Sequence, residues 1–240
     1  MRETIRISSR FQGPTQSCNG GYASGIVAGP LGSPAEVTLR RPPPLDYPLV
    51  LEWEDGHSRL WDGDALVAEG RQAEVILEIP PPPSWDEACA ASARSLKLDE
   101  HLLPRCFVCG PHRAEGDGLR IFPGPLAGPH GVYAAPWVPA PSLANDDGRV
   151  SDEYFWAALD CPGAHALYPD NLQPLLLGRL TGNIVGQARP GDRCMVTSWR
   201  IGGEGRKIFA GTAVFSEARA LLAYAHAVWI KVDSFAGAAT

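Results

Sequence analysis

Two parts of this 240-residue chain carry the same pattern at one constant distance along the sequence. In the first part a Pro-x-Asp motif precedes an apolar pair, a tryptophan and a glycine, and the second part repeats this series. The matched positions are Pro44, Asp46, Leu49, Val50, Trp53 and Gly56 in the first part and Pro190, Asp192, Met195, Val196, Trp199 and Gly202 in the second. After an insertion, 65–68 also matches 220–223. Several matches in register indicate a duplication, so the fold has to consist of two similar halves.

Each half predicts a helix followed by antiparallel strands. Alternating or β-branched apolar runs, separated by Asp-Gly and other turn residues, favour strands. Strands are expected over 35–40, 49–53, 58–61, 65–69 and 74–79 in the first half, and over 118–122, 131–138, 175–185, 194–201, 206–215 and 221–232 in the second. The prolines 80–83 end the first pattern, and Ser84 caps a predicted helix over 84–96. We therefore expect a first repeat over 1–80, a bridging segment over 81–100 and a second repeat over 101–240.

The stretch 150–167 joins an apolar helix to a single acid. Ser151 can cap the free N–H groups of a helix start, and an apolar run over 154–159 follows it. A helix that is apolar on nearly every side is usually buried. Asp160 comes directly after this run, where a charge is costly unless it is paired, hydrated or used in chemistry. Two interpretations stay open: a catalytic acid, or a helix that ends at Asp160 with the carboxylate in water.

A second candidate lies in the first half, where Asn19 precedes Gly20 and Gly21. Asparagine is a good helix N-cap, and glycines at a helix start let a substrate approach backbone N–H groups that carry partial positive charge. The alternative is a flexible turn. If a substrate binds here, the residues expected to contact it are Gly20, Tyr22, Ser24 and, from the second half, Trp156.

Three motifs of the chain occur in the same order in a known family. The stretch 106–111 followed by Gly118-Leu119 resembles the strand-entry motif of hotdog thioesterase-like proteins of the phenylacetate-pathway superfamily. Ala158-Leu159-Asp160 resembles the Leu-Ala-Asp of the central helix in that superfamily, and Asn19-Gly20-Gly21 resembles its His-Gly-Gly helix start. The resemblance covers most of the chain. It implies an α+β double hotdog fold and an acyl-CoA thioesterase-like hydrolase.

The family places the glycines and the acid on one helix, whereas this chain divides them between its halves. In hotdog dimers, as the resemblance implies, each site takes helix-start N–H groups from one subunit and its acid from the other. We therefore hypothesise one composite catalytic site, with Asn19 and Gly21 from the first half facing Asp160 from the second. Gly21 N–H would stabilise the oxyanion, and Asp160 would activate water or attack the carbonyl carbon directly. Asn19 stands where the family has a histidine, and it does not titrate near neutral pH.

The net charge limits the classes of binding partner, and the cysteine content indicates the cellular compartment. A net charge of −6 gives no support to binding nucleic acid or acidic lipid over wide areas. The chain has no apolar run long enough to cross a bilayer and no apolar signal core at its start. Six cysteines in a chain of this length predict reduced thiols in the cytoplasm. The expected partner is an acyl-CoA or a related acyl thioester, while a carrier protein in place of coenzyme A and pairing into a homodimer stay open.

Cys106-x-x-Cys109, with His101 and His112 nearby, offers ligand types that suit zinc. A single CxxC pair is a weak signal, and the apolar residues between the cysteines favour a strand. No metal is therefore predicted, and no cofactor apart from coenzyme A as part of the substrate. Whether Cys106 and Cys109 bind a metal stays open.

Two other functions remain as alternatives. Asp160 and His165 have the spacing of the acid and histidine in hotdog-fold enoyl thioester hydratases. The first alternative is therefore an enoyl-CoA hydratase or dehydratase. The second is a non-catalytic protein that binds an acyl thioester.

Overall fold

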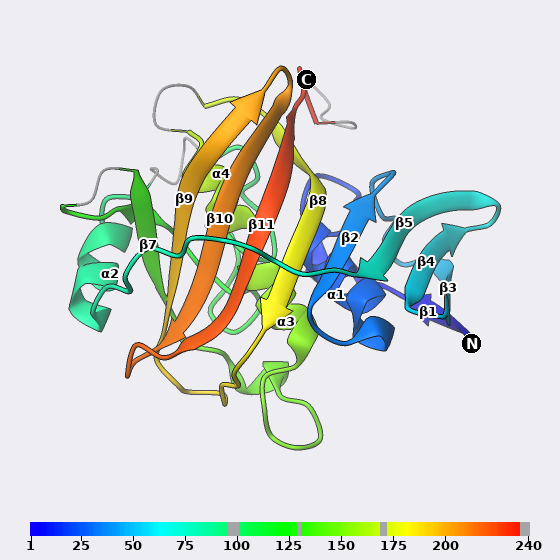
Figure 1. Ribbon diagram of the computed structural model, residues 1–240, viewed down its shortest axis with the longest axis horizontal. Coiled ribbons are helices and arrows are strands. Elements are labelled where there is room, and N and C mark those ends of the chain that lie inside the picture. Colours follow the sequence, from blue (N-terminus) through cyan, green and yellow to red (C-terminus); the bar gives the residue numbers. More distant parts are fainter. Residues whose placement is uncertain (96–100, 129–130, 169–171, 236–240) are drawn as a thin grey trace.

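One antiparallel sheet of eleven strands forms the frame of the protein (Figure 1). The computed structural model describes residues 1–95, 101–128, 131–168 and 172–235. The strands are β1 (Arg2–Arg6), β2 (Ala35–Leu39), β3 (Pro48–Glu54), β4 (His57–Asp62), β5 (Ala65–Gln72), β6 (Gly124–Pro125), β7 (Val132–Trp137), β8 (Leu175–Ile184), β9 (Cys194–Glu204), β10 (Lys207–Ser216) and β11 (Leu221–Lys231). The helices are α1 (Gly20–Ala28), α2 (Trp85–Ser92), α3 (Asp152–Ala158) and α4 (Cys161–His165), with short 3-10 turns at Ser9–Phe11, Gly29–Leu31 and Pro141–Leu143. None of these helices is long and apolar enough to span a membrane.

The strand order shows the duplication directly. Along the sheet the strands run β1-β3-β4-β5-β2-β8-β11-β10-β9-β7-β6. Outward from the central β2–β8 pair, β5, β4, β3 and β1 of the first half correspond to β11, β10, β9 and β7 of the second. The sequence matches follow this correspondence, because Leu49 and Met195 lie on β3 and β9. At the centre, Val37 pairs with Leu180, so the two halves share one continuous sheet.

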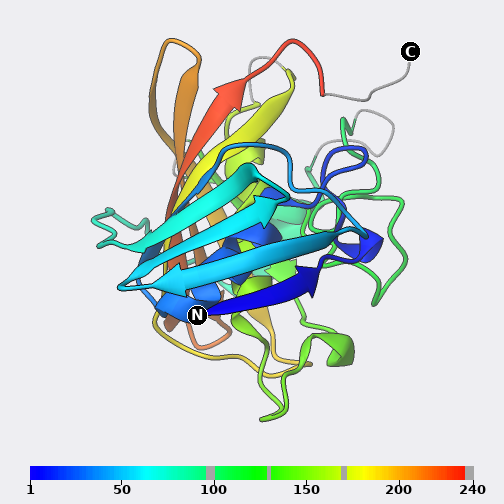
Figure 2. The same cartoon turned by 90° about the vertical axis from the view of Figure 1, so that its right-hand side faces the viewer.

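Helices α1 and α3 pack together on one face of the sheet, and Figure 2 shows them behind the strands of the first half. Two glycines of α1 permit their close approach. A Cβ atom on Gly21 would lie 2.5 Å from the carbonyl oxygen of Trp156, and one on Gly25 would lie 2.5 Å from the Cα of Glu153. These distances are far below van der Waals contact, so helix packing alone already requires glycine at both positions.

The predicted helix around 150–167 is present, but it is broken at the acid. Helix α3 ends at Ala158 with Leu159 as its C-cap, and α4 begins directly after Asp160, with Pro162 in its first turn. Proline is tolerated there because the first N–H groups of a helix have no partner within the helix. The interpretation that the Asp160 carboxylate faces water is wrong, since Asp160 is only 2% exposed. Ser151 occupies the N-cap position of α3, but its side chain makes no capping hydrogen bond.

The segment 74–79 was expected to be a strand and is not one. After β5 the chain crosses the outer face of the sheet as an extended strap (Figure 1), and Leu77 and Ile79 pack on a small apolar cluster there. Because β5 already pairs with β4 and β2, no sheet edge is free beside it. The prolines that follow also lack N–H donors for a ladder. The predicted helix after the strap is present as α2, with a capping box between Ser84 and Glu87.

The strand expected over 118–122 is also absent, as is strand structure at 107–108. These pieces exchange only two backbone hydrogen bonds, from Leu119 N–H to Phe107 O (2.8 Å) and from Ile121 N–H to Val108 O (2.9 Å). Their side chains are buried in the main core, which explains the apolar pattern. The predicted domain boundaries at 80 and 100 stay a prediction, and 96–100 of the predicted bridge lie outside the described residues.

Candidate functional site

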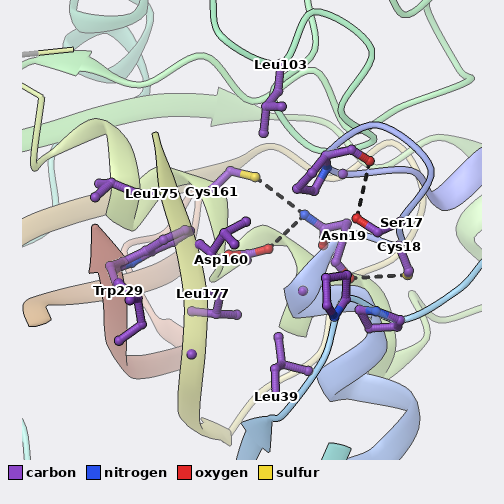
Figure 3. Close-up of a pocket in the computed structure, with 18 of the residues that line it drawn as sticks. Ser17, Cys18, Asn19, Leu39, Leu103, Asp160, Cys161, Leu175, Leu177 and Trp229 are labelled. Carbon is purple, nitrogen blue, oxygen red and sulfur yellow. Dashed lines mark hydrogen bonds between the residues drawn. The ribbon is translucent and has the colours of Figure 1, made fainter. Parts of the chain in front are cut away.

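A cavity of about 230 Å³ lies where the two halves meet (Figure 3). Both halves contribute to its wall, and the strands that reach it are the central ones, β2, β8 and β11. The first half supplies Gly13, Pro14, Ser17, Cys18, Asn19, Gly20, Leu39, Arg40, Arg41, Pro42 and Pro43; the second supplies Leu103, Cys106, Asp160, Cys161, Leu175, Leu176, Leu177, Gly178, Trp229, Ile230 and Val232. Most of this wall is apolar. Its polar groups lie at the start of α1, at the break between α3 and α4, and directly after β2, where Arg40 and Arg41 follow the strand.

Asp160 is the acid on this wall. Its Oδ2 atom accepts hydrogen bonds from the backbone N–H of Gly21 (2.8 Å) and from Nδ2 of Asn19 (2.7 Å). Its Oδ1 atom is buried and has no partner among the described residues. Burial raises the pKa of Asp160 to about 7, although the hydrogen bond from Gly21 opposes this rise. One carboxylate oxygen is therefore held in place, while the other, although buried, has no hydrogen-bond partner within the described part of the chain.

Asn19 makes the contacts that position the acid. Its Oδ1 accepts the N–H of Tyr22 (2.9 Å), which is the predicted N-cap bond of α1. Its Nδ2 donates to Asp160 and lies 3.4 Å from Sγ of Cys161. A single side chain thus fixes the helix start and orients a carboxylate from the other half.

The N–H of Gly21, proposed from the sequence as the oxyanion donor, is occupied by Asp160. That of Tyr22 is occupied by Asn19. The remaining donor of the first turn is the N–H of Gly20, which has no hydrogen-bond partner within the described residues and belongs to a residue of the cavity wall. The structure therefore shifts the free helix-start donor from Gly21 to Gly20.

The other residues expected at the substrate do not line the cavity. Tyr22 stacks on Phe11 with ring centroids 3.8 Å apart, inside an aromatic cluster. Ser24 donates its hydroxyl hydrogen to the carbonyl oxygen of Gly20 at 2.8 Å. Trp156 is buried with its ring against Gly182 on β8. All three are packing residues, because the face of α1 and α3 on which they lie is turned to the core rather than to the cavity.

Some cavity residues gave no sequence signal. Leu39, Leu177 and Trp229 read as ordinary strand residues, and only the sheet order brings their strands together. Arg40 and Arg41 follow β2 and are exposed at the cavity wall.

His165, the histidine of the alternative hydratase site, is buried outside the cavity lining. Burial lowers its pKa to about 3, so the ring is neutral.

No family model matches the sequence, and no curated protein matches it significantly. Solved structures match along nearly the whole chain. The tesB protein of Mycobacterium avium subsp. paratuberculosis is 13% identical, with a TM-score of 0.62 over 96% of this chain and 93% of that one. The acyl-CoA thioesterase II TesB2 of Mycobacterium marinum is 10% identical, with a TM-score of 0.61 over 97% and 93%.

A further match names the architecture. A protein of unknown function from Alicyclobacillus acidocaldarius, described as having a hot dog fold, is 9% identical with a TM-score of 0.54, over 96% of this chain and 93% of that one. The present chain has a double hotdog fold. The fold implied by the three sequence motifs is thereby confirmed, and the link to the phenylacetate-pathway type stays a prediction. At such identities the likeness concerns the double hotdog fold alone, so the reaction has to be argued from the site.

Proposed function

We propose that this double hotdog protein hydrolyses an acyl thioester in the cavity between its halves. The observation that carries the proposal is the state of Asp160. It is a buried carboxylate with one oxygen held by two donors from the other half and the other oxygen unpartnered. Such a group is costly to keep in a fold, and costly buried acids are concentrated at sites of chemistry.

The chemistry requires a base or nucleophile and a donor for the oxyanion. In the hydrolytic route, Oδ1 of Asp160 takes a proton from water while the water oxygen bonds to the carbonyl carbon. The C–S bond then breaks, and the proton passes to the leaving thiolate. In the alternative route, Oδ1 itself bonds to the carbonyl carbon and the C–S bond breaks, which leaves a mixed anhydride on Asp160 and a free thiolate. Water then hydrolyses the anhydride, which releases the acid, restores the Asp160 carboxylate and supplies the proton that the thiolate takes up. In either route, the N–H of Gly20 at the start of α1 is the donor that we assign to the developing oxyanion.

The size and lining of the cavity fit the acyl part of such a substrate. A volume of about 230 Å³ is below the roughly 300–1,000 Å³ typical of complete small-molecule sites. A nucleotide carrier would therefore extend outside it. Leu39, Leu177 and Trp229 offer an apolar wall to the acyl chain. The exposed guanidinium group of Arg41 offers charge to phosphates, whereas that of Arg40 is paired with Glu69. This arrangement supports coenzyme A as the carrier.

The cysteines support a reducing compartment. All six cysteines are unpaired, and five of them are buried. Disulfides are rare in the cytoplasm, and free thiols persist there. We therefore propose that the protein acts in the cytoplasm.

The test is a panel of acyl-CoA esters of increasing chain length, with release of free thiol measured. We expect turnover by the native protein and its loss in Asp160→Asn. Turnover that survives in Asp160→Asn would overturn the proposal. Hydration of enoyl-CoA that needs both Asp160 and His165 would indicate a hydratase, and acyl-CoA binding without turnover would indicate a binding protein; either result also overturns it.

A further inference from the structure

Three cysteine thiols meet beside the proposed catalytic acid. The Sγ atoms of Cys106, Cys109 and Cys161 all lie within 4.8 Å of one another, and those of Cys106 and Cys161 are 3.4 Å apart. All three side chains are buried. A disulfide would require about 2.05 Å between two sulfurs. A tetrahedral zinc ion with Zn–S bonds of about 2.3 Å spaces its sulfurs roughly 3.8 Å apart. The observed spacing is close to the second value.

Two histidines lie beside one thiol of this cluster, that of Cys109. Ligand atoms of His101 and His165 are within 4.8 Å of each other and of Cys109 Sγ. His165 is 4% exposed, and its Nδ1 is buried without a partner among the described residues. A buried imidazole nitrogen with no hydrogen bond is costly, and a metal ion would supply the missing partner.

The two histidines differ in what they can offer. Nδ1 of His101 accepts the backbone N–H of Leu103 at 3.1 Å, so in the neutral ring the proton is on Nε2. That Nε2–H is also buried without a partner. It suits donation to a thiolate better than coordination. His165 is therefore the candidate ligand, and His101 is a supporting donor.

The local chain geometry holds these ligands rigidly. Cys161 and His165 are four residues apart on α4, which places them on the same side of the helix. Cys106 and Cys109 lie in a turn closed by a hydrogen bond from Gly110 N–H to Cys106 O (2.9 Å). A Cβ atom on Gly110 would lie 2.5 Å from the Cys106 nitrogen, so the turn requires glycine there.

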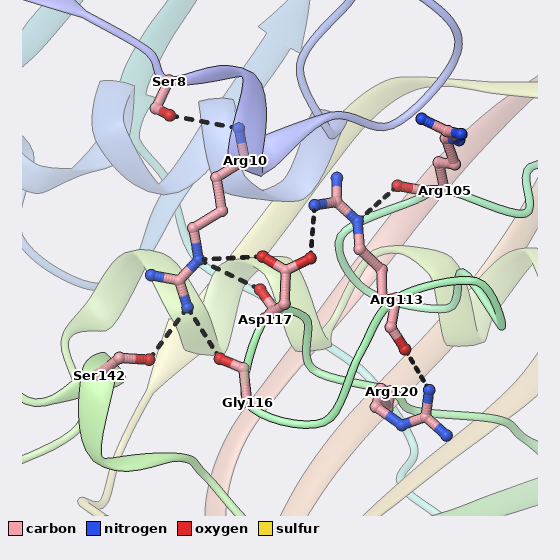
Figure 4. A network of polar contacts seen from close by, with 8 residues as sticks. All are labelled: Ser8, Arg10, Arg105, Arg113, Gly116, Asp117, Arg120 and Ser142. Atoms are coloured by element: carbon pink, nitrogen blue, oxygen red, sulfur yellow. Dashed lines mark hydrogen bonds and ion pairs between the residues drawn. The ribbon is translucent and has the colours of Figure 1, made fainter.

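The loop that carries Cys106 and Cys109 is anchored by a polar network (Figure 4). Arg10, from the first half, donates to the carbonyl oxygens of Asp117 (3.1 Å) and Gly116 (3.2 Å). Arg113 pairs with the Asp117 carboxylate at 3.0 Å and donates to the carbonyl oxygen of Arg105 at 2.7 Å. The loop has no helix or strand of its own around these cysteines, yet both of its ends are fixed.

We propose that Cys106, Cys109, Cys161 and His165 bind one zinc ion. Four protein ligands make this a closed, structural site, which ties the loop to α4 directly after Asp160. Two donors outside the ligand set would stabilise the thiolates. One is Nδ2 of Asn19, 3.4 Å from Cys161 Sγ, and the other is the Nε2–H of His101. This proposal does not depend on the thioesterase function, because it concerns a different set of side chains.

The first test uses the native sequence, so it does not depend on a variant that folds. Metal is removed with a chelator, and Co²⁺ is added as a spectroscopic substitute for zinc. We expect the sulfur-to-cobalt charge-transfer band and the visible bands of tetrahedral Co²⁺, at one ion per chain, and displacement of the cobalt by Zn²⁺. Absence of these bands, or a Cys106–Cys161 disulfide in freshly purified protein by mass spectrometry, would overturn the proposal.

The second test assigns the ligands by variants. Protein produced with zinc in the medium is analysed for bound metal by mass spectrometry. We expect the zinc content per chain to fall at least about tenfold below that of the native protein in each of Cys106→Ser, Cys109→Ser and Cys161→Ser. Cys194→Ser, which changes a buried cysteine on β9 outside the cluster, should retain it. His165→Asn should weaken binding and shift the visible cobalt bands. An unchanged spectrum in His165→Asn, or equal loss in Cys194→Ser, contradicts the assignment.

Discussion

The backbone N–H of Gly21 donates a 2.8 Å hydrogen bond to Oδ2 of Asp160, joining two residues that are 139 positions apart. One belongs to the first half of the duplicated fold, and the other belongs to the second. The bond forms where α1 packs closely against α3, at a point where glycine is the only residue that fits. The packing of the two halves and the placement of the acid therefore depend on the same contact.

Replacing Asp160 by asparagine removes the charge while keeping the shape. The amide oxygen can still accept from Gly21 and Asn19, so the fold should be retained. Loss of a general base typically costs about 10²–10⁴-fold in rate. We expect a fall of that size in kcat/KM for acyl-CoA hydrolysis, measured by thiol release.

Asp152→Asn is the matched control. It replaces an aspartate by asparagine in the same way, but Asp152 lies in the first turn of α3, outside the cavity wall. Its activity should stay within about twofold of the native protein, since surface substitutions usually have small effects. An equal loss in both variants would mean that the effect is on folding rather than on the site.

Gly21→Ala should destabilise the protein. The added methyl group would lie 2.5 Å from both the Asp160 Cβ and the Trp156 carbonyl oxygen, so α1 and α3 must separate. Overpacking of this kind typically costs about 1–3 kcal/mol. We expect a lower midpoint of urea unfolding with an unchanged slope.

Gly29→Ala provides the comparison within the same part of the chain. Gly29 caps the C-terminal end of α1 in right-handed helical backbone, and apart from its two chain neighbours a Cβ atom there would meet nothing within 4 Å. Pro30 follows, and proline disfavours helical backbone for a preceding residue that carries a Cβ atom, so we expect a small cost, below the about 1–3 kcal/mol expected for Gly21→Ala. A Gly21→Ala variant as stable as Gly29→Ala would contradict the close helix approach.

The two similar halves could be predicted because each helix and strand has a local sequence pattern, and this pattern occurs in both halves. Leu49 and Met195 occupy equivalent strands, and the helices and most strands follow from apolar period and turn residues. The pairing of Asn19 and Gly21 with Asp160 could also be hypothesised, because the motifs are divided between the halves. Their roles in catalysis remain a prediction.

Other features could not be predicted because they depend on tertiary contacts that have no local sequence pattern. The segment 74–79 has strand periodicity, but it becomes a strap because no sheet edge is available to it. The approach of Cys161 to Cys106 depends on how α4 turns after Asp160, which no local pattern shows. Occupation of the Gly21 N–H by Asp160 likewise depends on tertiary packing.

Activity should depend on the ionisation of Asp160. Burial raises its pKa from its ordinary value of 3.8 to about 7, and only the ionised form acts as base or nucleophile. We expect kcat/KM to be low at pH 5, to rise through about pH 7 and to reach a plateau above pH 8. The profile is recorded on protein treated with a chelator, because a cation bound beside the acid would lower this pKa. A profile that is flat between pH 5 and 8 would argue against Asp160.

The same pKa predicts the opposite trend for stability. Because the folded-state pKa is raised, the stabilising contribution is fully present below pH 4 and is lost as the pH rises to about 7. The difference corresponds to roughly 4 kcal/mol at most. Asp160→Asn should therefore gain stability over the native protein at pH 8 but not at pH 4, measured by urea unfolding in the same chelator-treated protein.

Arg41 should matter for the carrier and not for the acyl group. Arg41 is exposed at the cavity wall and makes no ion pair with any residue in the described part of the chain, whereas Arg40 is bonded to Glu69. A charge-assisted contact to a phosphate at an exposed site is worth about 1 kcal/mol. We expect Arg41→Ala to raise KM for acyl-CoA about fivefold with little change in kcat. The same acyl group on N-acetylcysteamine, which lacks the phosphates, should show no change in KM. An equal rise for both substrates would place the nucleotide elsewhere and assign Arg41 to the shape of the cavity.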